Sequence, residues 1–236
     1  MAIYFSSVYG STKQYAEELA RRLSTTAQEI PNPAVVPDAA AEGPIIVLAP
    51  AHGPMNAAAK FAKSLPETTI QARPTCVVTV GMTLDHVVRE ADPTAELVGD
   101  RADQVQRFYL PGRLNYSELT AAHAGVMRGI IGALKLKPRK SENERSMIEM
   151  YKKDTDRVEL SRLDDIVAWA EAAKTNRKDI KRYRNNSPTS INDKNRPAKP
   201  ALSLSDIFSA PKIAPKRIPW GNASREREHR ASISRR

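Results

Sequence analysis

The stretch that decides the fold is Ala2-Ile-Tyr-Phe-Ser-Ser-Val-Tyr-Gly-Ser-Thr-Lys-Gln-Tyr-Ala-Glu-Glu-Leu19, close to the start of the chain. Residues 2–5 form a short run rich in β-forming residues, and a loop of hydroxyl residues around one glycine follows. From Thr12 onward apolar residues recur every three or four positions, which predicts a helix with one buried face. These apolar positions are Tyr15, Ala16, Leu19, Ala20 and Leu23. The stretch therefore predicts a strand, a tight polar loop and a helix.

The loop between this strand and this helix is suited to hold an anion. Its hydroxyl groups converge with the free N–H groups of the helix start, and both favour a negative ligand there. Gly10 gives the backbone the freedom to close around that point. The candidate phosphate-binding residues are Ser6, Ser7, Tyr9, Gly10, Ser11 and Thr12. A serine-rich turn that only caps the helix is the alternative.

The spacing of this loop excludes two common nucleotide-binding motifs. The lysine and spacing of a P-loop are missing, and so is the GxGxxG dinucleotide fingerprint. Residues 7–12, Ser-Val-Tyr-Gly-Ser-Thr, instead resemble the loop with which flavodoxins hold the phosphate of FMN. Tyr9 stands where many flavodoxins have threonine, and Ser11 where asparagine is common.

Further apolar runs predict the rest of a sheet. Residues 44–49 and 75–80 are nearly continuous β-branched runs, as expected for parallel strands covered on both faces. Residues 105–110 form a shorter and more mixed run, and residues 27–30 form a weak strand candidate. Helical patterns separate these runs, so the chain is predicted to form an α/β fold, a flavodoxin-like doubly wound parallel sheet between two helical layers.

Three loops are expected to meet at the ligand edge of that sheet, residues 6–12, 50–56 and 81–85. In the flavodoxin-like arrangement the first holds the phosphate, and the other two flank the isoalloxazine ring. The resemblance implies cofactor contacts from Ala51, His52, Gly53, Gly81, Met82 and Thr83. Flavodoxins often stack an aromatic residue on each ring face, whereas this chain offers His52, Met55 and Met82.

An insertion, about residues 113–153, separates this chain from an ordinary flavodoxin. Residues 116–137 predict a helix with apolar residues on one side and basic residues around it. Such a helix could lie on an anionic membrane, line the site of a hydrophobic substrate, or be a core helix with a solvated basic end. Residues 156–160 predict a short last strand, and Ser161 with Asp164 predicts a capping box that starts the closing helix.

The order of parts across residues 1–173 is similar to the flavodoxin-type protoporphyrinogen IX dehydrogenase family, which is coupled to menaquinone or ubiquinone. The matching motifs are residues 5–12, Gly53 with Phe61 after it, residues 110–114 (Leu-Pro-Gly-Arg-Leu) and residues 154–157 (Asp-Thr-Asp-Arg). The resemblance implies FMN as cofactor, a quinone as electron acceptor and protoporphyrinogen IX as a candidate donor. Residues 51–55, Ala-His-Gly-Pro-Met, depart from the bulkier basic-aromatic sequence of that family.

Two other functions stay open at this point. One is a flavodoxin-type electron carrier, which exchanges single electrons with a protein partner and shows no turnover of a small molecule. The other is a degenerate flavodoxin scaffold whose basic tail binds nucleic acid or acidic lipid. No Ser-His-Asp pattern with a nucleophile elbow is present, so hydrolysis is disfavoured. The four histidines lack metal-ligand spacing, so no metal site is predicted.

Charge divides the chain into two parts. Residues 174–236 hold 17 Lys and Arg against 5 Asp and Glu, a net charge of +12, whereas the whole chain carries +10 and residues 1–173 therefore −2. Prolines, serines and asparagines replace any apolar period after residue 173, which predicts a disordered tail behind a domain of residues 1–173. Its positive charge could bind RNA, DNA, acidic lipid or another acidic partner.

The cysteine content and the apolar runs bound the cellular location. Cys76 is the only cysteine, which excludes an internal disulfide and fits a reducing compartment. No signal peptide and no apolar run of about 18 residues are visible. We expect a cytoplasmic protein that touches the inner face of a membrane, if at all, through residues 116–140.

Overall fold

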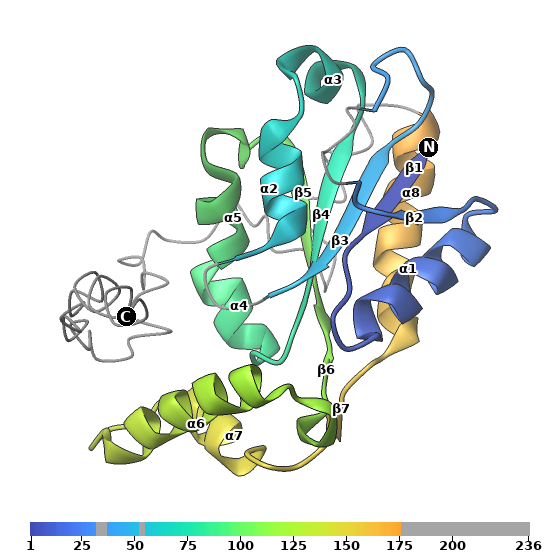
Figure 1. The fold of residues 1–236 in the computed structure, drawn as a ribbon. Helices are drawn as coiled ribbons and strands as arrows, with labels where there is room; N and C mark the ends of the chain where they lie inside the picture. The colour runs from blue at the N-terminus through green and yellow to red at the C-terminus, as the bar shows by residue number, and fades with distance from the viewer. Residues whose placement is uncertain (32–36, 52–54, 176–236) are drawn as a thin grey trace, which may run out of the picture.

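The computed structural model describes residues 1–31, 37–51 and 55–175 and has a twisted sheet at its centre (Figure 1). The strands of this sheet are β1 (Ala2–Phe5), β2 (Ala27–Glu29), β3 (Ile45–Pro50), β4 (Thr75–Gly81) and β5 (Val105–Pro111). All neighbours pair in parallel, in the order β2-β1-β3-β4-β5. This is the strand order of flavodoxin-like sheets, so the predicted fold class is confirmed.

Helices cover both faces of the sheet. On one face lie α1 (Ser11–Arg22) and α8 (Leu163–Thr175), and Figure 1 shows them side by side. The other side carries α2 (Ala57–Ser64), α3 (Glu67–Ala72), α4 (Asp85–Ala91), α5 (Pro93–Val98) and the 3₁₀ turn η1 (Gly99–Arg101). The molecule is therefore three-layered, as the alternation of strand and helix patterns predicts.

The central position of β3 in the sheet explains why its sequence is apolar without interruption. Ile46 and Leu48 pack into the core beneath α1 and α8. Ile45 and Val47 point the other way, into the core beneath α2. All four side chains are fully buried, because a parallel strand in the middle of the sheet has no face in contact with water.

The insertion forms a small module below the carboxyl ends of the strands (Figure 1). It contains β6 (Arg113–Leu114), the 3₁₀ turn η2 (Tyr116–Glu118), α6 (Ala121–Leu136), α7 (Glu142–Glu149) and β7 (Thr155–Asp156). The two short strands pair antiparallel, Arg113 opposite Asp156 and Leu114 opposite Thr155. The module thus leaves the sheet and returns to it at one place.

The helix predicted over residues 116–137 begins later, at Ala121. Thr120 caps it, because its side-chain oxygen accepts a hydrogen bond from the amide of His123 at 3.3 Å. Of its 16 residues only Ile131 is buried. The sequence left open that this helix is a core helix with a solvated basic end, and that alternative is therefore wrong.

The strand predicted over residues 156–160 is also wrong, because only its first residue is in a strand. β7 pairs with β6 and does not join the five-stranded sheet. The amide of Arg157 then bonds to the carbonyl of Gly112 at 3.0 Å, and the chain turns into the 3₁₀ turn η3 (Leu160–Arg162). The last described helix, α8, follows this turn.

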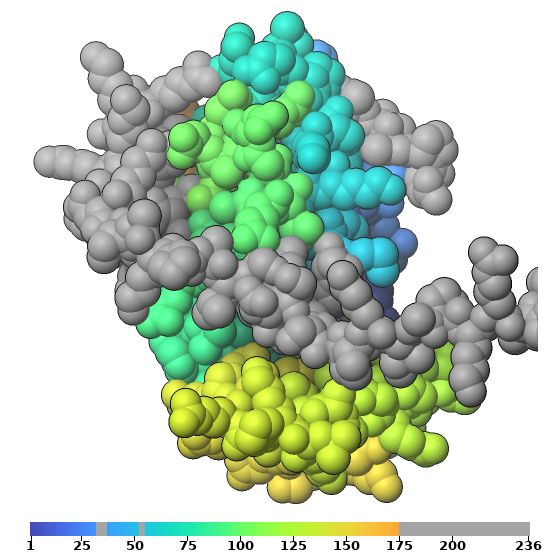
Figure 2. Space-filling view, turned by 90° about the vertical axis from the view of Figure 1, so that its left-hand side faces the viewer, coloured from blue at the N-terminus to red at the C-terminus, as the bar shows by residue number. Residues whose placement is uncertain are grey.

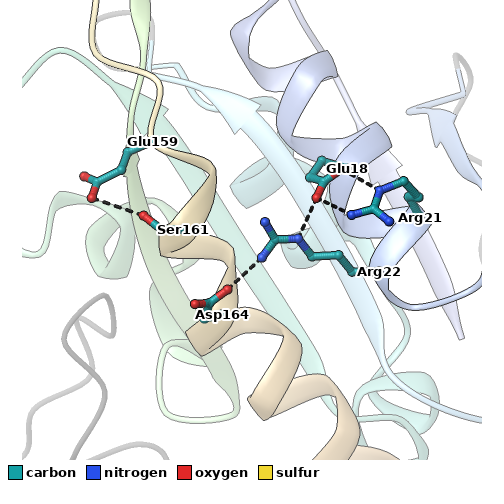
Figure 3. A network of polar contacts seen from close by, with 6 residues as sticks. All are labelled: Glu18, Arg21, Arg22, Glu159, Ser161 and Asp164. Carbon is teal, nitrogen blue, oxygen red and sulfur yellow. Dashed lines mark hydrogen bonds and ion pairs between the residues drawn. The ribbon is translucent and has the colours of Figure 1, made fainter.

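The capping box predicted at Ser161 does not form. Ser161 lies inside η3, and its hydroxyl bonds to the carboxylate of Glu159 at 3.2 Å (Figure 3). A capping box forms instead at the start of α7. There Ser141 and Glu144 each accept a hydrogen bond from the backbone amide of the other.

A polar bridge on the surface joins the two helices of one face (Figure 3). The carboxylate of Glu18 on α1 accepts hydrogen bonds from Arg21 at 2.8 Å and from Arg22 at 2.7 Å. Arg22 also reaches Asp164 on α8, at 2.7 Å. The hydrogen bonds from Arg21 and Arg22 lower the pKa of Glu18 to about 2. The carboxylate of Glu18 therefore stays charged at neutral and mildly acidic pH.

The hydroxyl of Tyr15 joins α1 to both ends of the insertion. It donates to the carbonyl of Pro111, the last residue of β5, at 2.8 Å. It also accepts from the amide of Glu159, just before η3, at 2.7 Å. The side chain is fully buried, so neither partner has water as a substitute.

Replacing Tyr15 tests this link. Tyr15→Phe leaves the amide of Glu159 and the carbonyl of Pro111 without a partner, so we expect a loss of about 1 to 3 kcal/mol in the free energy of unfolding. Urea titration followed by circular dichroism measures it. Tyr4→Phe is the control, because it keeps the ring contact with Phe61 at 5.1 Å between centroids. An equal loss in both variants would contradict the link.

The same hydroxyl gives a pH dependence. Burial raises the pKa of Tyr15 from 10.0 to about 12. Because the folded-state pKa is the higher one, the neutral phenol stabilises the fold fully below pH 10.0 and loses this contribution as the pH rises toward 12. Wild-type protein should therefore lose stability more steeply than Tyr15→Phe between these pH values, as measured by urea titration at each pH.

Candidate functional site

The strand order reverses between β1 and β3, so the loops after these two strands define the ligand edge of the sheet. The first of them is fixed at both ends. The amide of Ser6 bonds to the carbonyl of Leu48 at 2.9 Å, which holds the loop to β3. The hydroxyl of Ser7 accepts from the amide of Lys13 at 3.3 Å, which closes the loop over the start of α1.

Gly10 ends the loop in a left-handed conformation, with φ +81°. A residue with a side chain rarely adopts this conformation, which explains a glycine here. Gly10 also occupies the N-cap position of α1 and has no side chain with which to cap it. The first amides of α1, those of Ser11 and Thr12, have no acceptor within the helix. The helix start therefore offers donors to an external group.

The side chain of Thr12 is the strongest sign of a missing ligand. Thr12 is 0% exposed, and within the described parts of the chain its hydroxyl has no hydrogen-bond partner. A buried polar atom without a partner costs about 1 to 3 kcal/mol, so natural structures keep few of them without a reason. The hydroxyl lies in the first turn of α1, beside Ser11, which is also buried. An anion at the helix start would give it a partner.

Arg113 brings a positive charge to this loop and is not among the residues that the sequence predicts for the site. A Cβ atom built on Gly10 would lie 3.9 Å from Nη1 of Arg113. The guanidinium is held in place by Asp156, at 2.9 Å from Nε and 2.6 Å from Nη2, and by Oε1 of Gln14, at 3.1 Å from Nη2. Nη1 is thus the nitrogen nearest the loop.

The ion pair of Arg113 with Asp156 is partly exposed, with 2.6 Å between Nη2 and the carboxylate. Burial works against ionisation of Asp156, yet the hydrogen bond from Arg113 holds the pKa of this carboxyl below its ordinary value. The two residues are opposite one another in the β6–β7 pair. They lie 43 positions apart in the sequence, and no local spacing signals their contact. Only the pairing of the insertion's two ends brings this charge to the site.

Tyr9 connects the loop to the inserted module. Its hydroxyl lies 3.3 Å from Nδ1 of His123 on α6. Burial raises the pKa of Tyr9, so its phenol is neutral at physiological pH. Tyr9 therefore links two elements of the site, while its predicted contact with a cofactor stays a prediction.

The loop after β4, residues 81–83, has its backbone carbonyls engaged by the protein. The carbonyl of Gly81 accepts from the amide of Gly112 at 2.7 Å. That of Met82 accepts from Arg157 at 3.3 Å, and that of Thr83 from the hydroxyl of Tyr109 at 2.8 Å. These bonds hold the loop in one position.

Gly81 also gives the side chain of Tyr109 room in this loop. A Cβ atom there would lie 3.0 Å from the hydroxyl oxygen of Tyr109, closer than side chains tolerate without a shift. Burial raises the pKa of Tyr109, and its phenol therefore stays neutral and donates to the loop. The glycine thus allows the tyrosine to fix the loop.

The loop after β3 is described only at its ends. Ala51 is exposed, and its amide bonds to the carbonyl of Val80 at 2.8 Å. At the other end Asn56 caps α2 and donates to the hydroxyl of Thr79 at 2.9 Å. His52 and Gly53 lie outside the described residues, so their predicted cofactor contacts stay predictions.

The described residues contain no candidate metal site and no membrane-spanning helix. No group of three or more His, Cys, Asp or Glu side chains among them could hold a metal ion. None of the helices in residues 1–31, 37–51 and 55–175 has the length and hydropathy needed to cross a membrane. Cys76 is fully buried in β4, and burial raises the pKa of its thiol, so it is not a reactive thiolate.

The comparison with known families gives one result. A family described as a flavodoxin domain matches residues 2–141, more than half of the chain. The match includes the five strands, the three loops of the ligand edge and α6. The search of curated proteins and the search of solved structures found no match.

The orphaned hydroxyl of Thr12 predicts an unusual effect of mutation. Thr12→Val removes the hydroxyl at nearly constant volume, so we expect the ligand-free protein to be unchanged or more stable by about 1 kcal/mol. Thermal unfolding of protein freed of bound ligand measures this effect.

Thr79→Val is the matched control for that experiment. The Thr79 hydroxyl contacts Thr94 at 2.9 Å and accepts from Asn56 at 2.9 Å, so its loss should destabilise the protein by about 1 to 3 kcal/mol. If Thr12→Val destabilised the protein as much as Thr79→Val, the Thr12 hydroxyl would have a partner inside the protein.

Proposed function

The chain belongs to the flavodoxin domain family, and on this premise we propose that residues 1–173 form an FMN-dependent oxidoreductase. It would pass electrons from a hydrophobic donor, with protoporphyrinogen IX as the candidate, to a quinone. The observation that carries the flavin assignment is the buried hydroxyl of Thr12, unpartnered within the described residues at the start of α1. The phosphate of FMN would supply the missing partner.

The residues around the β1–α1 loop fit a phosphate group. The hydroxyls of Ser11 and Thr12 and the first amides of α1 are hydrogen-bond donors at a positive helix end. Ser7 fixes the loop through the amide of Lys13. Arg113 adds a full positive charge near Gly10, where a doubly charged phosphate would sit. These residues would therefore bind FMN more tightly than riboflavin, which lacks the phosphate.

The other two loops would hold the flavin ring. Residues 81–83 are fixed by their three engaged carbonyls, so they would offer a preformed surface. Ala51 lies exposed at the end of β3, next to this loop through its bond to Val80. Met55 is 71% exposed and would cover apolar ring surface in place of an aromatic side chain.

FMN, when bound, supplies one-electron and two-electron redox chemistry. The chain itself would bind and orient it and admit the donor. In the net reaction each turnover would take two hydrogen atoms from the donor and reduce one quinone to its quinol. The α6 helix favours hydrophobic reactants, because it is joined to the β1–α1 loop by the Tyr9 contact with His123 and exposes the apolar side chain of Val126.

The flavin assignment predicts a selective loss of affinity. Arg113→Gln should weaken FMN binding about 10- to 100-fold, as expected for loss of a charge-assisted contact, and leave riboflavin binding within about threefold. Quenching of flavin fluorescence during titration measures both affinities. Arg21→Gln is the control, because Arg21 lies in the last turn of α1, far from the N-cap Gly10 of the same helix. A protein that binds neither flavin would overturn the assignment.

The redox assignment needs a separate measurement. Flavin-loaded protein, kept free of oxygen, should reduce a soluble quinone when a porphyrinogen is supplied, and the loss of quinone absorbance follows this. A protein that binds FMN but shows no quinone reduction would instead be an electron carrier for a protein partner. A protein that binds no flavin would favour the scaffold function. In that function a basic tail binds nucleic acid or acidic lipid, and this tail lies outside the described residues.

A further inference from the structure

Helix α6 presents an apolar face to the solvent. Only Ile131 of its 16 residues is buried. The exposed positions that carry no charge or polar group are Ala121, Ala122, Gly125, Val126, Gly129, Gly132 and Leu136. Val126 is 61% exposed and Leu136 is 86% exposed. Surface helices of globular proteins normally turn charged and polar residues to water, so this face has the composition of a contact surface.

The charges around this face have one sign. Between Leu119 and Lys140 the chain contains five Lys and Arg residues and no Asp or Glu. Lys137 is neutralised by Glu144 of α7, at 2.7 Å. Arg128 and Arg139 are exposed and have no acidic partner among the residues that the structure describes. An occupant of this face must therefore tolerate or carry negative charge.

This charge argues against two occupants from the protein itself. Residues 174–236 carry +12 and would be repelled by the basic residues around α6. A second copy packed through the same helix would bring two basic rims together, with no acidic residue of residues 119–140 between them. Neither occupant has the complementary charge.

We propose that the exposed face of α6 docks on an anionic phospholipid bilayer, with the helix lying in the interface plane. Exposed apolar side chains enter the acyl boundary, and basic residues around them meet the lipid phosphates. Nucleic acid would satisfy Arg128 and Arg139 but offers nothing to Val126 and Leu136. The apolar residues therefore favour lipid.

The position of α6 makes this docking geometrically simple. In Figures 1 and 2 the inserted module forms the lower end of the molecule, beyond the helices that cover the sheet. The contact of His123 with Tyr9 places the start of α6 next to the β1–α1 loop. A docked α6 would thus bring the ligand edge of the sheet close to the lipid. The docking itself does not require a flavin.

A fluorescent label on α6 tests the proposal in the full chain. Cys76 is buried, so a polarity-sensitive thiol dye on Val126→Cys or Leu136→Cys reports on one site. Vesicles of phosphatidylcholine with 30% phosphatidylglycerol should shift the emission of both labels to the blue and shield them from aqueous iodide at least threefold. Vesicles of phosphatidylcholine alone should cause at most a small change. Adding Arg128→Ser and Arg139→Ser should weaken the vesicle affinity several-fold.

Thr68→Cys is the control label, because it is exposed on α3 at the opposite end of the sheet (Figure 1). Three outcomes would overturn the proposal. Vesicle binding without a change at positions 126 and 136 would assign it to the basic tail. A concentration-dependent shift without vesicles would assign the face to a second copy. An equal shift with duplex DNA or RNA would assign it to nucleic acid. No flavin is added, so failure here leaves the proposed function standing.

Discussion

The hydroxyl of Tyr15 joins three parts of this structure that are distant in the sequence. One of its hydrogen bonds goes to the end of β5, where the insertion leaves the sheet, and the other goes to Glu159, where the chain returns. The ring of Tyr15 lies in the hydrophobic core between α1 and the sheet, and α1 follows the candidate phosphate loop. The buried phenol therefore helps to fix the inserted module relative to that loop. Arg113 approaches Gly10 from this module.

The candidate site combines rigid parts with unsatisfied groups at the start of α1. Residues 81–83 have their carbonyls engaged, and Ser7 closes the first loop over α1. Against this background the lone hydroxyl of Thr12 stands out, because it is buried and unpartnered within the described residues. A protein that keeps such a group in a buried position gives up stability in its free form. The free energy recovered when a partner arrives favours binding.

Much of the fold could be predicted from local patterns. The apolar runs at residues 44–49 and 75–80 became β3 and β4 almost residue for residue, because a strand buried on both faces tolerates few polar side chains. The strand at 105–110 looked mixed because of Arg107. The structure pairs this buried arginine with Asp92 at 2.8 Å, and β5 is buried along its whole length. A contact between residues 15 positions apart leaves no periodic signal.

The candidate site could be predicted only where it is local. The loop of residues 6–12 is a continuous motif, and its glycine and hydroxyls were read from spacing alone. Arg113 could not be found in this way, because its place is set by Asp156 across the β6–β7 pair. The face of α6 could not be assigned either, since the same apolar period fits a core helix and an exposed one. The structure shows an exposed helix, because Ile131 is the only buried residue of α6.

The two-residue pairing of β6 with β7 also places the two ends of the insertion next to each other. All five strands of the sheet are complete before Arg113, and α8 packs on them after the chain has come back. The length and composition of the segment between the two short strands can therefore vary with little effect on the sheet. Exchanging this segment between homologous proteins would change what lies beside the ligand edge and leave the sheet in place.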